Sequence, residues 1–482
     1  MLDAGRPDAV AKQRGRGAMT ARERITALLD EGSEFLEYGA LARPIDPRLE
    51  APAEGVVAGT GLLHGQTVVV LSYDYTAMGG SQGPLGHIKL DRIFGVARAR
   101  QCPVVIISEG GGARSQEMTY VVRSHDDFRK LVRLSGKVPV VGIAPGRAFA
   151  GHANLLGMTD AIIATRDAAI GIAGPPLVKS AVGTDLTPEE IGRVEVHEKA
   201  GTVDVTVDDD GAALDVAREY LAYFMHPRLP HDGKDDPVVA DLLRELVPAN
   251  PRQAFDGRRL VELVADPGTM LELRPRFGGA AVTALTRIGG RSVGVIATNP
   301  MVQAGSINAD TADKIARFIR LCDSHGIALL FLCDSPGFLV GPQAEEQALI
   351  RHSTRVLMAL GAARVPLLTV IVRRSYGLAY LAMGALSWEP IFHAVWPSAE
   401  FGAMGLSGAS AIRAQSSAPG ADVPREEVLG ALSEHGSAFR MAERLQTDDA
   451  IDPGDTRRLL IQALTDAPTF VTEEIHRPID SW

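Results

Sequence analysis

The stretch TVVVLSYDYTAMGGSQG at residues 67–83 decides the fold, because its plan recurs as SVGVIATNPMVQAGSIN at residues 292–308. In both stretches an apolar run leads into a turn of small residues. The correspondence extends outward at a spacing of 225 residues, pairing Gly65, Gly80 and Lys89 with Gly290, Gly305 and Lys314 (290 − 65, 305 − 80, 314 − 89). A fixed spacing of this kind indicates two copies of one structural unit.

Each copy continues with an Arg-containing helix, a second apolar run and a turn that contains glycine. In the first copy we expect strands at 55–60, 67–74, 104–108 and 138–144 and helices at about 87–101, from about 116 and from about 151. In the second copy we expect strands at 293–298, 327–333 and 366–372 and helices at 311–325, 343–361 and from about 378. Alternating strands and helices predict an α/β fold in each half.

The length of 482 residues also favours two domains, since single cores stop growing near about 250–300 residues. Five prolines and mixed charges at 226–255 are typical of an interdomain connection. We therefore divide the chain into domains at 1–245 and 246–482. Near the start, Thr20 and Glu23 have the spacing of a capping box and predict the beginning of a helix.

Composition excludes several classes of protein. A net charge of −10 argues against nucleic acid or an anionic membrane as a general partner. Cys102, Cys322 and Cys333 form no CxxC pair, so we expect buried thiols in a reducing compartment and no zinc site. The histidines show no metal-ligand spacing, and no metal is expected. Apolar runs of about ten residues are too short to span a bilayer, and the first 25 residues lack an apolar core, which predicts a cytoplasmic protein.

Four glycine-bearing turns are the candidate sites: EGGGAR at 109–114, FAGHA at 149–153, DSPGF at 334–338 and YGLAY at 376–380. Each lies where an apolar strand is followed by a helix. A helix start exposes unpaired N–H groups, and small residues let a ligand carbonyl approach them closely. Two such groups can form an oxyanion hole that stabilises an enolate or a ureido oxyanion. The alternative is that these glycines only make tight turns. The sequence contains no dinucleotide or P-loop fingerprint.

The chain resembles the carboxyltransferase β-subunit family of biotin-dependent acyl-CoA carboxylases, of the propionyl/acetyl-CoA type. The resemblance runs from about residue 12 to 465 and is carried by several long stretches: TARERITALLDEGSEFLEYGALA (20–42), GGARSQE (111–117), GPPLVKSAVGTDLTPEEIG (174–192), NPMVQAGSINADTADKIARFIRLCD (299–323), DSPGFLVGPQAE (334–345), RRSYGLAYLAMG (373–384) and WPSAEFGAMGLSGA (396–409). It implies two tandem crotonase-like domains of the ββα superhelix type and a site between subunits of a homo-oligomer, either a dimer or a trimer of dimers.

The resemblance also implies the reaction: transfer of a carboxyl group from carboxybiotin to the α-carbon of an acyl-CoA, through a thioester enolate. The amides of Gly151 and His152 would face the thioester oxygen, and those of Leu378 and Ala379 would face the biotin ureido oxygen. CO2 would be released in the closed site, biotin N1 would take the α-proton, and no side-chain base would be needed. The biotin would come from a separate carrier subunit and a biotin carboxylase, because the chain has no Met-Lys-Met carrier motif.

Other residues receive supporting roles by the same resemblance. Those around the two biotin and CoA turns are Gly111, Gly112, Ala113, Arg114, Gly377 and Tyr380. Arg114 and its neighbour Gln116 either contact CoA phosphates or tie down their loop. Lys179 either lines the acyl-CoA pocket or is a solvated lysine. Leu381 is expected to line the acyl pocket, where it would suit an aliphatic chain.

The chain departs from the family at three places. Gly151-His152-Ala153 stands for two glycines and an alanine, Leu378 replaces the second glycine of Tyr-Gly-Gly-Ala-Tyr, and Glu109-Gly110 replaces Asp-Ser. Leu378 would narrow the biotin path. His152 either donates a hydrogen bond or proton near the acyl hole, or packs away from it. Two rival functions follow: a biotin-independent acyl-CoA enolate enzyme, such as a decarboxylase or hydrolase, and a non-catalytic scaffold paralogue.

Overall fold

The computed structural model describes residues 3–119, 126–231, 237–250, 252–404, 430, 434–467 and 478–480. The chain forms two compact units: the first ends its main part at Met225 and the second begins at His226, while the described C-terminal residues 478–480 return to the first unit, where the Ile479 amide donates to Ser135 Oγ at 3.0 Å. The interval 226–245 therefore belongs to the second unit, whereas the sequence placed it in the first domain. The reason is the helix α10 (Pro237–Leu246), whose Leu243 is buried in the core of the second unit.

The first unit is built on one sheet. Within the described residues its strand order is β1-β2-β3-β4-β5-β7-β9, and the strands are β1 Leu36–Glu37, β2 Val56–Leu63, β3 Gln66–Tyr73, β4 Val104–Ile107, β5 Val140–Ala144, β7 Ala161–Thr165 and β9 Val205–Val207. The first two pairs are antiparallel and the others parallel. A separate parallel pair joins β6 (Arg147–Phe149) and β8 (Ala169–Gly171).

The second unit repeats this sheet strand for strand. In the described part its order is β10-β11-β12-β13-β14-β15-β17, with β10 Leu271–Leu273, β11 Ala281–Ile288, β12 Arg291–Thr298, β13 Ala328–Ser335, β14 Leu367–Tyr376, β15 Phe392–Val395 and β17 Asp449–Ala450. Again the first two pairs are antiparallel and the rest parallel. The strand β16 (Glu400–Gly402) pairs with the end of β14, where β8 pairs with β6 in the first unit. The predicted internal repeat and α/β fold are confirmed.

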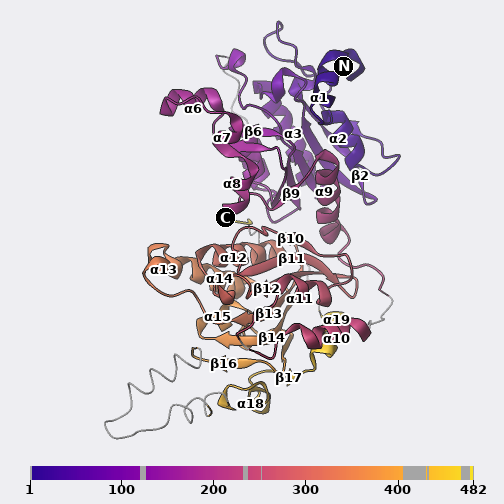
Figure 1. Ribbon diagram of the computed structural model, residues 1–482. Helices are drawn as coiled ribbons and strands as arrows, with labels where there is room; N and C mark the ends of the chain where they lie inside the picture. Colours follow the sequence, from indigo (N-terminus) through magenta and orange to yellow (C-terminus); the bar gives the residue numbers. More distant parts are fainter. Residues whose placement is uncertain are drawn as a thin grey trace. The chain divides into compact units, whose positions relative to one another are not determined.

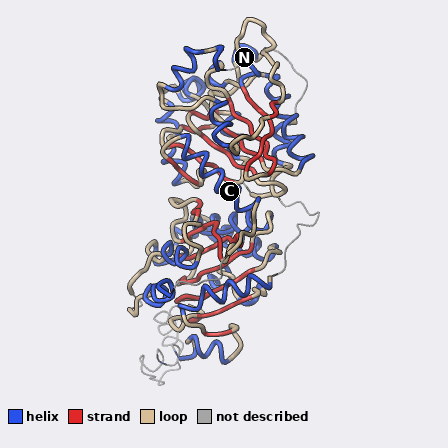
Figure 2. Tube along the Cα trace, turned by 90° about the vertical axis from the view of Figure 1, so that its right-hand side faces the viewer, coloured by secondary structure: helices blue, strands red, loops and turns tan. Residues whose placement is uncertain are grey.

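Helices cover both faces of each sheet (Figures 1 and 2). In the first unit α2 (Ala21–Leu28) and α9 (Asp210–Met225) lie on one face, and α3 (Pro84–Arg100), α4 (Asp127–Val132) and α5 (Gly151–Gly157) on the other. In the second unit α10, α11 (Gly257–Val264) and α19 (Thr456–Asp466) cover one face, and α12 (Ala309–Ser324) and α14 (Leu349–Ala362) the other. Strands buried on both faces explain the continuous apolar runs in the sequence.

The remaining described helices are short: α1 Pro7–Arg14, α6 Pro175–Val182, α7 Pro188–Gly192, α8 Val194–Lys199, α13 Pro342–Glu346, α15 Leu378–Ala382 and α18 Ala438–Glu443. Two sequence expectations are wrong here. The helix expected from about 116 is a single 3-10 turn, Ser115–Glu117, and α4 begins only at Asp127. The helix expected at 343–361 is split by Ala348, whose φ of 54° separates α13 from α14.

A buried lysine supports the same strand in each unit. Lys89 Nζ in α3 donates to the carbonyls of Val56 at 2.6 Å and Ala53 at 3.1 Å. Lys314 Nζ in α12 donates to the carbonyl of Ala281 at 2.7 Å. Val56 and Ala281 are themselves separated by the repeat spacing (281 − 56 = 225). The paired lysines noticed in the sequence therefore tie each long helix to the antiparallel hairpin of its sheet.

Because Lys89 is buried, its ionisation should make the free energy of unfolding depend on pH. Burial lowers its pKa from 10.5 to about 8, so between these values the unfolded chain binds the proton and the folded chain does not. Stability relative to Lys89→Met is therefore expected to rise with pH across this window, by about 3 kcal/mol in total. Denaturant unfolding of both proteins at pH 7 to 10.5 measures the difference. A difference that does not change with pH would contradict the assignment.

Candidate active site

The starts of α5 and α15 have the same unusual backbone. Ala150 precedes α5 with φ 55° and ψ −119°, and Gly377 precedes α15 with φ 59° and ψ −146°. The two residues are equivalent in the repeat (377 − 150 = 227). Glycine adopts this conformation readily, whereas Ala150 is strained in it, and such strain is typical of functional turns.

These turns present two pairs of backbone amides. Gly151 and His152 are the first two residues of α5, and Leu378 and Ala379 the first two of α15. First-turn N–H groups have no acceptor within their own helix. In the described part of the chain, no hydrogen bond from these four amides to another backbone or side-chain group is present. Each pair therefore has unused donors, and the accessible residue of each pair is its first, Gly151 or Leu378, since His152 and Ala379 are 0% exposed.

The second glycine turn of each copy lies beside the first. In the first unit the Gly110 amide donates to Arg147 O at 2.6 Å, and the Phe149 amide donates to Gly110 O at 3.0 Å. Gly112 has φ 101°, and a Cβ there would lie 2.9 Å from the Cβ of Ala150. The loop 110–114 is therefore packed against the turn that starts α5. In the second unit Ser335 and Ser375 are paired in β13 and β14, which brings 334–338 beside 376–380.

Arg114 ties down its loop. Its guanidinium donates to Glu117 at 2.7 Å and Glu54 at 3.1 Å, and all three side chains are fully buried. It also donates to the carbonyl of Ser81 at 3.1 Å. Of the two roles considered from the sequence, contact with CoA phosphates is thus disfavoured, because the side chain would have to leave two buried carboxylates. Gln116 is exposed.

His152 is a buried, neutral histidine. Its Nε2 lies 2.9 Å from Gly80 O, its Nδ1 lies 3.0 Å from Ser108 Oγ, and its ring meets the edge of Tyr73 at 4.3 Å between centroids. Burial lowers the pKa of His152 to about 3. Of the roles considered from the sequence, supply of a proton at neutral pH is disfavoured, because the ring is neutral, its one N–H faces the Gly80 carbonyl and it points into the unit.

Side chains around the second amide pair differ in exposure. Leu378, which carries the first amide of this pair, is 65% exposed. The Tyr380 hydroxyl accepts from the Leu386 amide at 3.0 Å, and burial raises its pKa. Leu381 is half-buried, and its carbonyl accepts from Trp388 Nε1 at 2.7 Å. Lys179 forms an exposed ion pair with Asp185 at 2.6 Å, which agrees with the solvated alternative.

Sequence reasoning missed the buried charge clusters behind the turns. Glu109 pairs with Arg24 at 2.7 Å, and Arg24 also bonds Asp210 at 2.9 Å. In the second unit Asp334 pairs with Arg373 and with Arg374, each at 2.7 Å. Glu109 and Asp334 stand at the repeat spacing (334 − 109 = 225), which was the available signal. Both copies thus have an acidic residue at this position, but the arginines that pair with it come from different elements of each unit.

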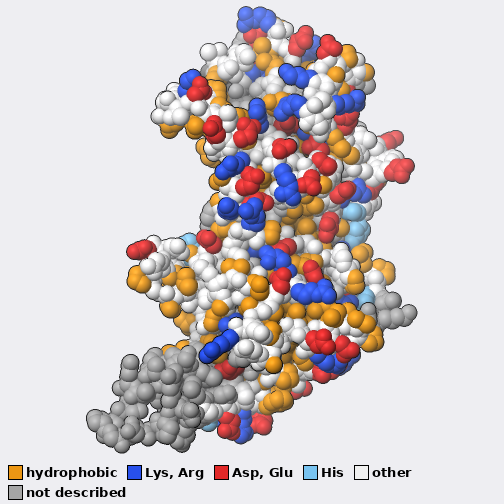
Figure 3. Space-filling view, in the orientation of Figure 1, with side chains coloured by type: hydrophobic (Ala, Val, Ile, Leu, Met, Phe, Trp, Pro, Cys, Tyr) orange, Lys and Arg blue, Asp and Glu red, His pale blue; other side chains and the backbone are white. Residues whose placement is uncertain are grey.

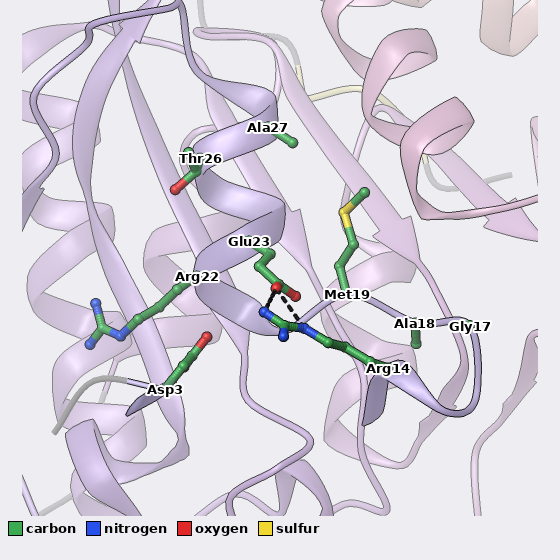
Figure 4. Close-up of a pocket in the computed structure, with 9 residues that line it drawn as sticks. All are labelled: Asp3, Arg14, Gly17, Ala18, Met19, Arg22, Glu23, Thr26 and Ala27. Carbon is green, nitrogen blue, oxygen red and sulfur yellow. Dashed lines mark hydrogen bonds and ion pairs between the residues drawn. The ribbon is translucent and has the colours of Figure 1, made fainter. Parts of the chain in front are cut away.

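A pocket of about 690 Å³ lies elsewhere in the first unit, between α2 and the loop before it (Figure 4). Two of its lining residues, Arg14 and Glu23, point toward each other and form an ion pair, with Nε and Oε1 2.9 Å apart. It is lined by Asp3, Arg14, Gly17, Ala18, Met19, Arg22, Glu23, Thr26 and Ala27. None of the predicted site residues lines this pocket.

Other surface and chemical features are unremarkable. Acidic and basic side chains are interspersed over the face seen in Figure 3. Cys102, Cys322 and Cys333 are buried free thiols. Among the described residues, no cluster of three or more His, Cys, Asp or Glu could hold a metal ion, and no helix has both the length and the apolarity needed to cross a bilayer.

Comparison with known proteins defines the class. Residues 12–474 match the carboxyl transferase domain family, and the chain belongs to this family. It is 35% identical over 491 residues to the methylmalonyl-CoA carboxyltransferase 12S subunit of Propionibacterium freudenreichii subsp. shermanii, covering 97% of this chain and 92% of that protein. It is also 35% identical over 471 residues to the propionyl-CoA carboxylase beta chain of Cereibacter sphaeroides, covering 94% and 91%.

Solved structures agree. The transcarboxylase 12S hexamer with bound methylmalonyl-coenzyme A and methylmalonic acid has a TM-score of 0.89 at 34% identity, covering 98% of this chain and 94% of that one. A single-chain, multi-domain long-chain acyl-CoA carboxylase has a TM-score of 0.88 at 39% identity, and this chain spans 48% of it. The resemblance seen in the sequence and the two crotonase-like domains are therefore confirmed.

Proposed function

We propose that this chain is an acyl-CoA carboxyltransferase that moves a carboxyl group between carboxybiotin and the α-carbon of an acyl-CoA. Family membership supplies the reaction class. The observation that carries the proposal to this chain's own residues is the duplicated turn, which leaves one pair of free amides at α5 and another at α15. Two holes suit a reaction in which two different oxygens gain negative charge.

We assign the first hole to the acyl-CoA. The amides of Gly151 and His152 would donate to the thioester oxygen and stabilise the enolate that forms when the α-proton leaves. Gly111 and Gly112 would let the thioester approach the loop closely, because neither carries a side chain. His152 takes no part in proton transfer, since burial keeps its ring neutral.

We assign the second hole to the ureido oxygen of biotin. The residues fit a neutral ring with one carbonyl: two free amides start α15, and Gly377 holds the turn without a side chain. When bound, carboxybiotin supplies the CO2 and the base. The amides of Leu378 and Ala379 would hold the ureido oxygen, Tyr380 would fix the helix through Leu386, and Leu381 would line the acyl side. Ala113, Arg114 and Lys179 keep only supporting roles in this scheme.

We further propose an acyl-CoA with a short aliphatic chain, a biotin carboxylase with its carrier as partners, and a homo-oligomer. Support for the substrate comes from relatives named for propionyl-CoA and methylmalonyl-CoA. Support for the assembly comes from the transcarboxylase 12S hexamer. One relative, from Propionigenium modestum, is named a methylmalonyl-CoA decarboxylase subunit, so the direction of transfer needs its own test.

The test uses the purified full chain, radiolabelled methylmalonyl-CoA and free biotin. Label appearing in carboxybiotin, together with formation of propionyl-CoA, is the result expected of a carboxyltransferase. Propionyl-CoA formed equally fast with avidin present to sequester biotin would instead indicate a biotin-independent decarboxylase. Binding of methylmalonyl-CoA without any turnover, in the presence of the cognate carrier, would favour a scaffold.

The exposed Leu378 gives a prediction about biotin access. Because the residue that carries the first amide of α15 has a side chain that is 65% exposed, Leu378→Gly is expected to raise the rate with free biotin. The gain should appear as a lower KM for biotin, with the KM for acyl-CoA unchanged. Met358→Ala, which trims another exposed apolar side chain of the same unit, is the control and should change neither. An unchanged KM in Leu378→Gly would rule out steric narrowing.

A further inference from the structure

The two copies hold one equivalent backbone carbonyl with different side chains. Gly80 and Gly305 end the small-residue turn of each copy, with φ of 66° and 82°. In the first copy the Gly80 carbonyl accepts from His152 Nε2 at 2.9 Å. In the second copy the Gly305 carbonyl accepts from Ser335 Oγ at 3.0 Å. The carbonyl is buried in the turn in both cases, and each copy supplies one donor for it.

The two donors come from positions that are exchanged between the copies. Ser335 corresponds to Gly110 (335 − 110 = 225), and His152 corresponds to Ala379 (379 − 152 = 227). A Cβ on Gly110 would lie 2.4 Å from His152 Nε2 and 2.4 Å from Gly80 O, closer than real Cβ atoms come. In the present conformation a side chain at 110 is therefore excluded both by the imidazole of His152 and by the backbone of Gly80. The first copy has glycine with histidine, and the second has serine with alanine.

The imidazole is held in a single orientation. A carbonyl oxygen can only accept, so His152 Nε2 carries the hydrogen that Gly80 O receives. In the neutral ring Nδ1 then accepts from the Ser108 hydroxyl at 3.0 Å. His152 is 0% exposed, and its ring lies against the edge of Tyr73. The side chain acts as a rigid brace.

The brace closes a circuit of backbone contacts around the first amide pair. The Gln82 amide donates to Gly112 O at 2.8 Å, which joins the turn 78–82 to the loop 110–114. Gly110 exchanges hydrogen bonds with Arg147 and Phe149, which joins that loop to β6 and to the start of α5. The imidazole returns from α5 to the turn. His152, which carries this imidazole, also provides the second amide of the first hole.

We propose that His152, made possible by Gly110, is a positioning residue: its imidazole clamps the Gly80 carbonyl and so fixes the amides of Gly151 and His152. The clamp replaces the hydroxyl clamp that Ser335 provides in the second copy. The proposal rests on the proposed function for its effect on rate, but the clamp itself is a structural contact that can be measured separately.

The test imports the second copy's pair into the first. His152→Ala leaves the Gly80 carbonyl without a donor, and Gly110→Ser collides with the ring. Each alone is expected to lower kcat by roughly 10- to 100-fold, with the KM for acyl-CoA unchanged, because the clamp touches no substrate atom. In the double variant Gly110→Ser/His152→Ala the ring is gone, but the turn 78–82 must still shift to the geometry that Gly305 has beside Ser335, because a Cβ at 110 would also lie 2.4 Å from Gly80 O. With that shift the serine hydroxyl can donate to Gly80 O, and kcat is expected to recover to within roughly threefold of wild type.

Two further readouts separate positioning from acid–base chemistry and from simple loss of folding. The pH profile of kcat in the double variant should superimpose on that of wild type. If the imidazole were catalytic, its removal would abolish one limb of the profile. His152→Gln places an amide donor at the reach of Nε2, and His152→Asn only at the reach of Nδ1. His152→Gln should therefore keep the greater part of kcat, and His152→Asn should behave like His152→Ala.

Hydrogen exchange distinguishes failure of this proposal from failure of the proposed function. Peptides spanning 78–83 and 110–114 should exchange faster in His152→Ala and return toward wild type in the double variant, whether or not the protein transfers carboxyl groups. If the wild-type protein shows no carboxyl transfer, the proposed function is contradicted but the clamp is not. Wild-type kcat in His152→Ala, or a double variant that regains its melting temperature but not its kcat, would overturn the positioning role.

Discussion

Leu378→Pro is expected to lower kcat by roughly 10²- to 10³-fold, which is the usual cost of removing one oxyanion-hole donor. Leu378 is the first residue of α15, a position where proline fits a helix well and only the N–H is lost. This chain already starts α6, α7 and α13 with prolines. Gly377 precedes the site without a Cβ, which removes one of the contacts that a following proline ring makes unfavourable.

The control for this change is Leu378→Ala, which keeps the amide and removes most of the side chain. Because Leu378 is 65% exposed, neither variant loses buried packing, and both should melt near the wild-type temperature. We expect the alanine variant to retain roughly the wild-type kcat, so that the difference between the pair reports the main-chain N–H alone. Steady-state carboxyl transfer and thermal unfolding measure both quantities. Equal kcat in the two variants would remove the second amide pair from the mechanism.

Arg114→Met is expected to lower the free energy of unfolding by about 3–5 kcal/mol, because it leaves two buried carboxylates without their cation. Glu54 and Glu117 are both fully buried against the guanidinium. The cluster also has no room to rearrange, since a Cβ on Gly83 would lie 2.0 Å from Glu54 Oε1. Urea denaturation of variant and wild type measures the loss.

The matched control is Arg129→Met, which removes an ion pair with Asp126 that is 57% and 46% exposed. Exposed pairs contribute about 0–1 kcal/mol, so this change should be nearly silent.

The deficit of Arg114→Met should also depend on pH. Burial already raises the pKa of Glu54, and loss of the cation raises it further, so the folded variant binds more protons than its unfolded chain. Its stability should fall as the pH rises from 5 to 8. A deficit as small as that of Arg129→Met would contradict the account.

The sequence predicted the architecture because the repeat is written in local features. Apolar runs, small-residue turns and paired lysines such as Lys89 and Lys314 occur at one spacing, and the strands formed where those runs lie. Short elements were missed for the opposite reason. No strand or helix was predicted from the sequence between residues 166 and 211, but this stretch holds β8, α6, α7, α8 and β9. Only the capping box of Thr187 and Glu190, which begins α7, offered a local signal there.

The side-chain roles at the site could not be predicted, because they depend on partners distant in the sequence. Arg114 is neutralised by Glu54, which lies 60 residues earlier. His152 is neutral because the fold buries its ring, and only the folded chain brings Ser108 and Gly80 to its two nitrogens. For both residues the sequence left two roles open. In each case the contacts favour the role in which the side chain packs within its own unit. The four backbone amides, by contrast, were assigned through the family resemblance, and in the described part of the chain they form no hydrogen bond to another protein group.

The most direct test of the two-hole account is an experimental structure of the protein with propionyl-CoA and biotin bound. The account predicts that the thioester oxygen lies within hydrogen-bonding distance of the Gly151 and His152 amides, and the ureido oxygen within that distance of the Leu378 and Ala379 amides. A thioester bound against other groups, with the amides at the start of α5 facing only water, would contradict it.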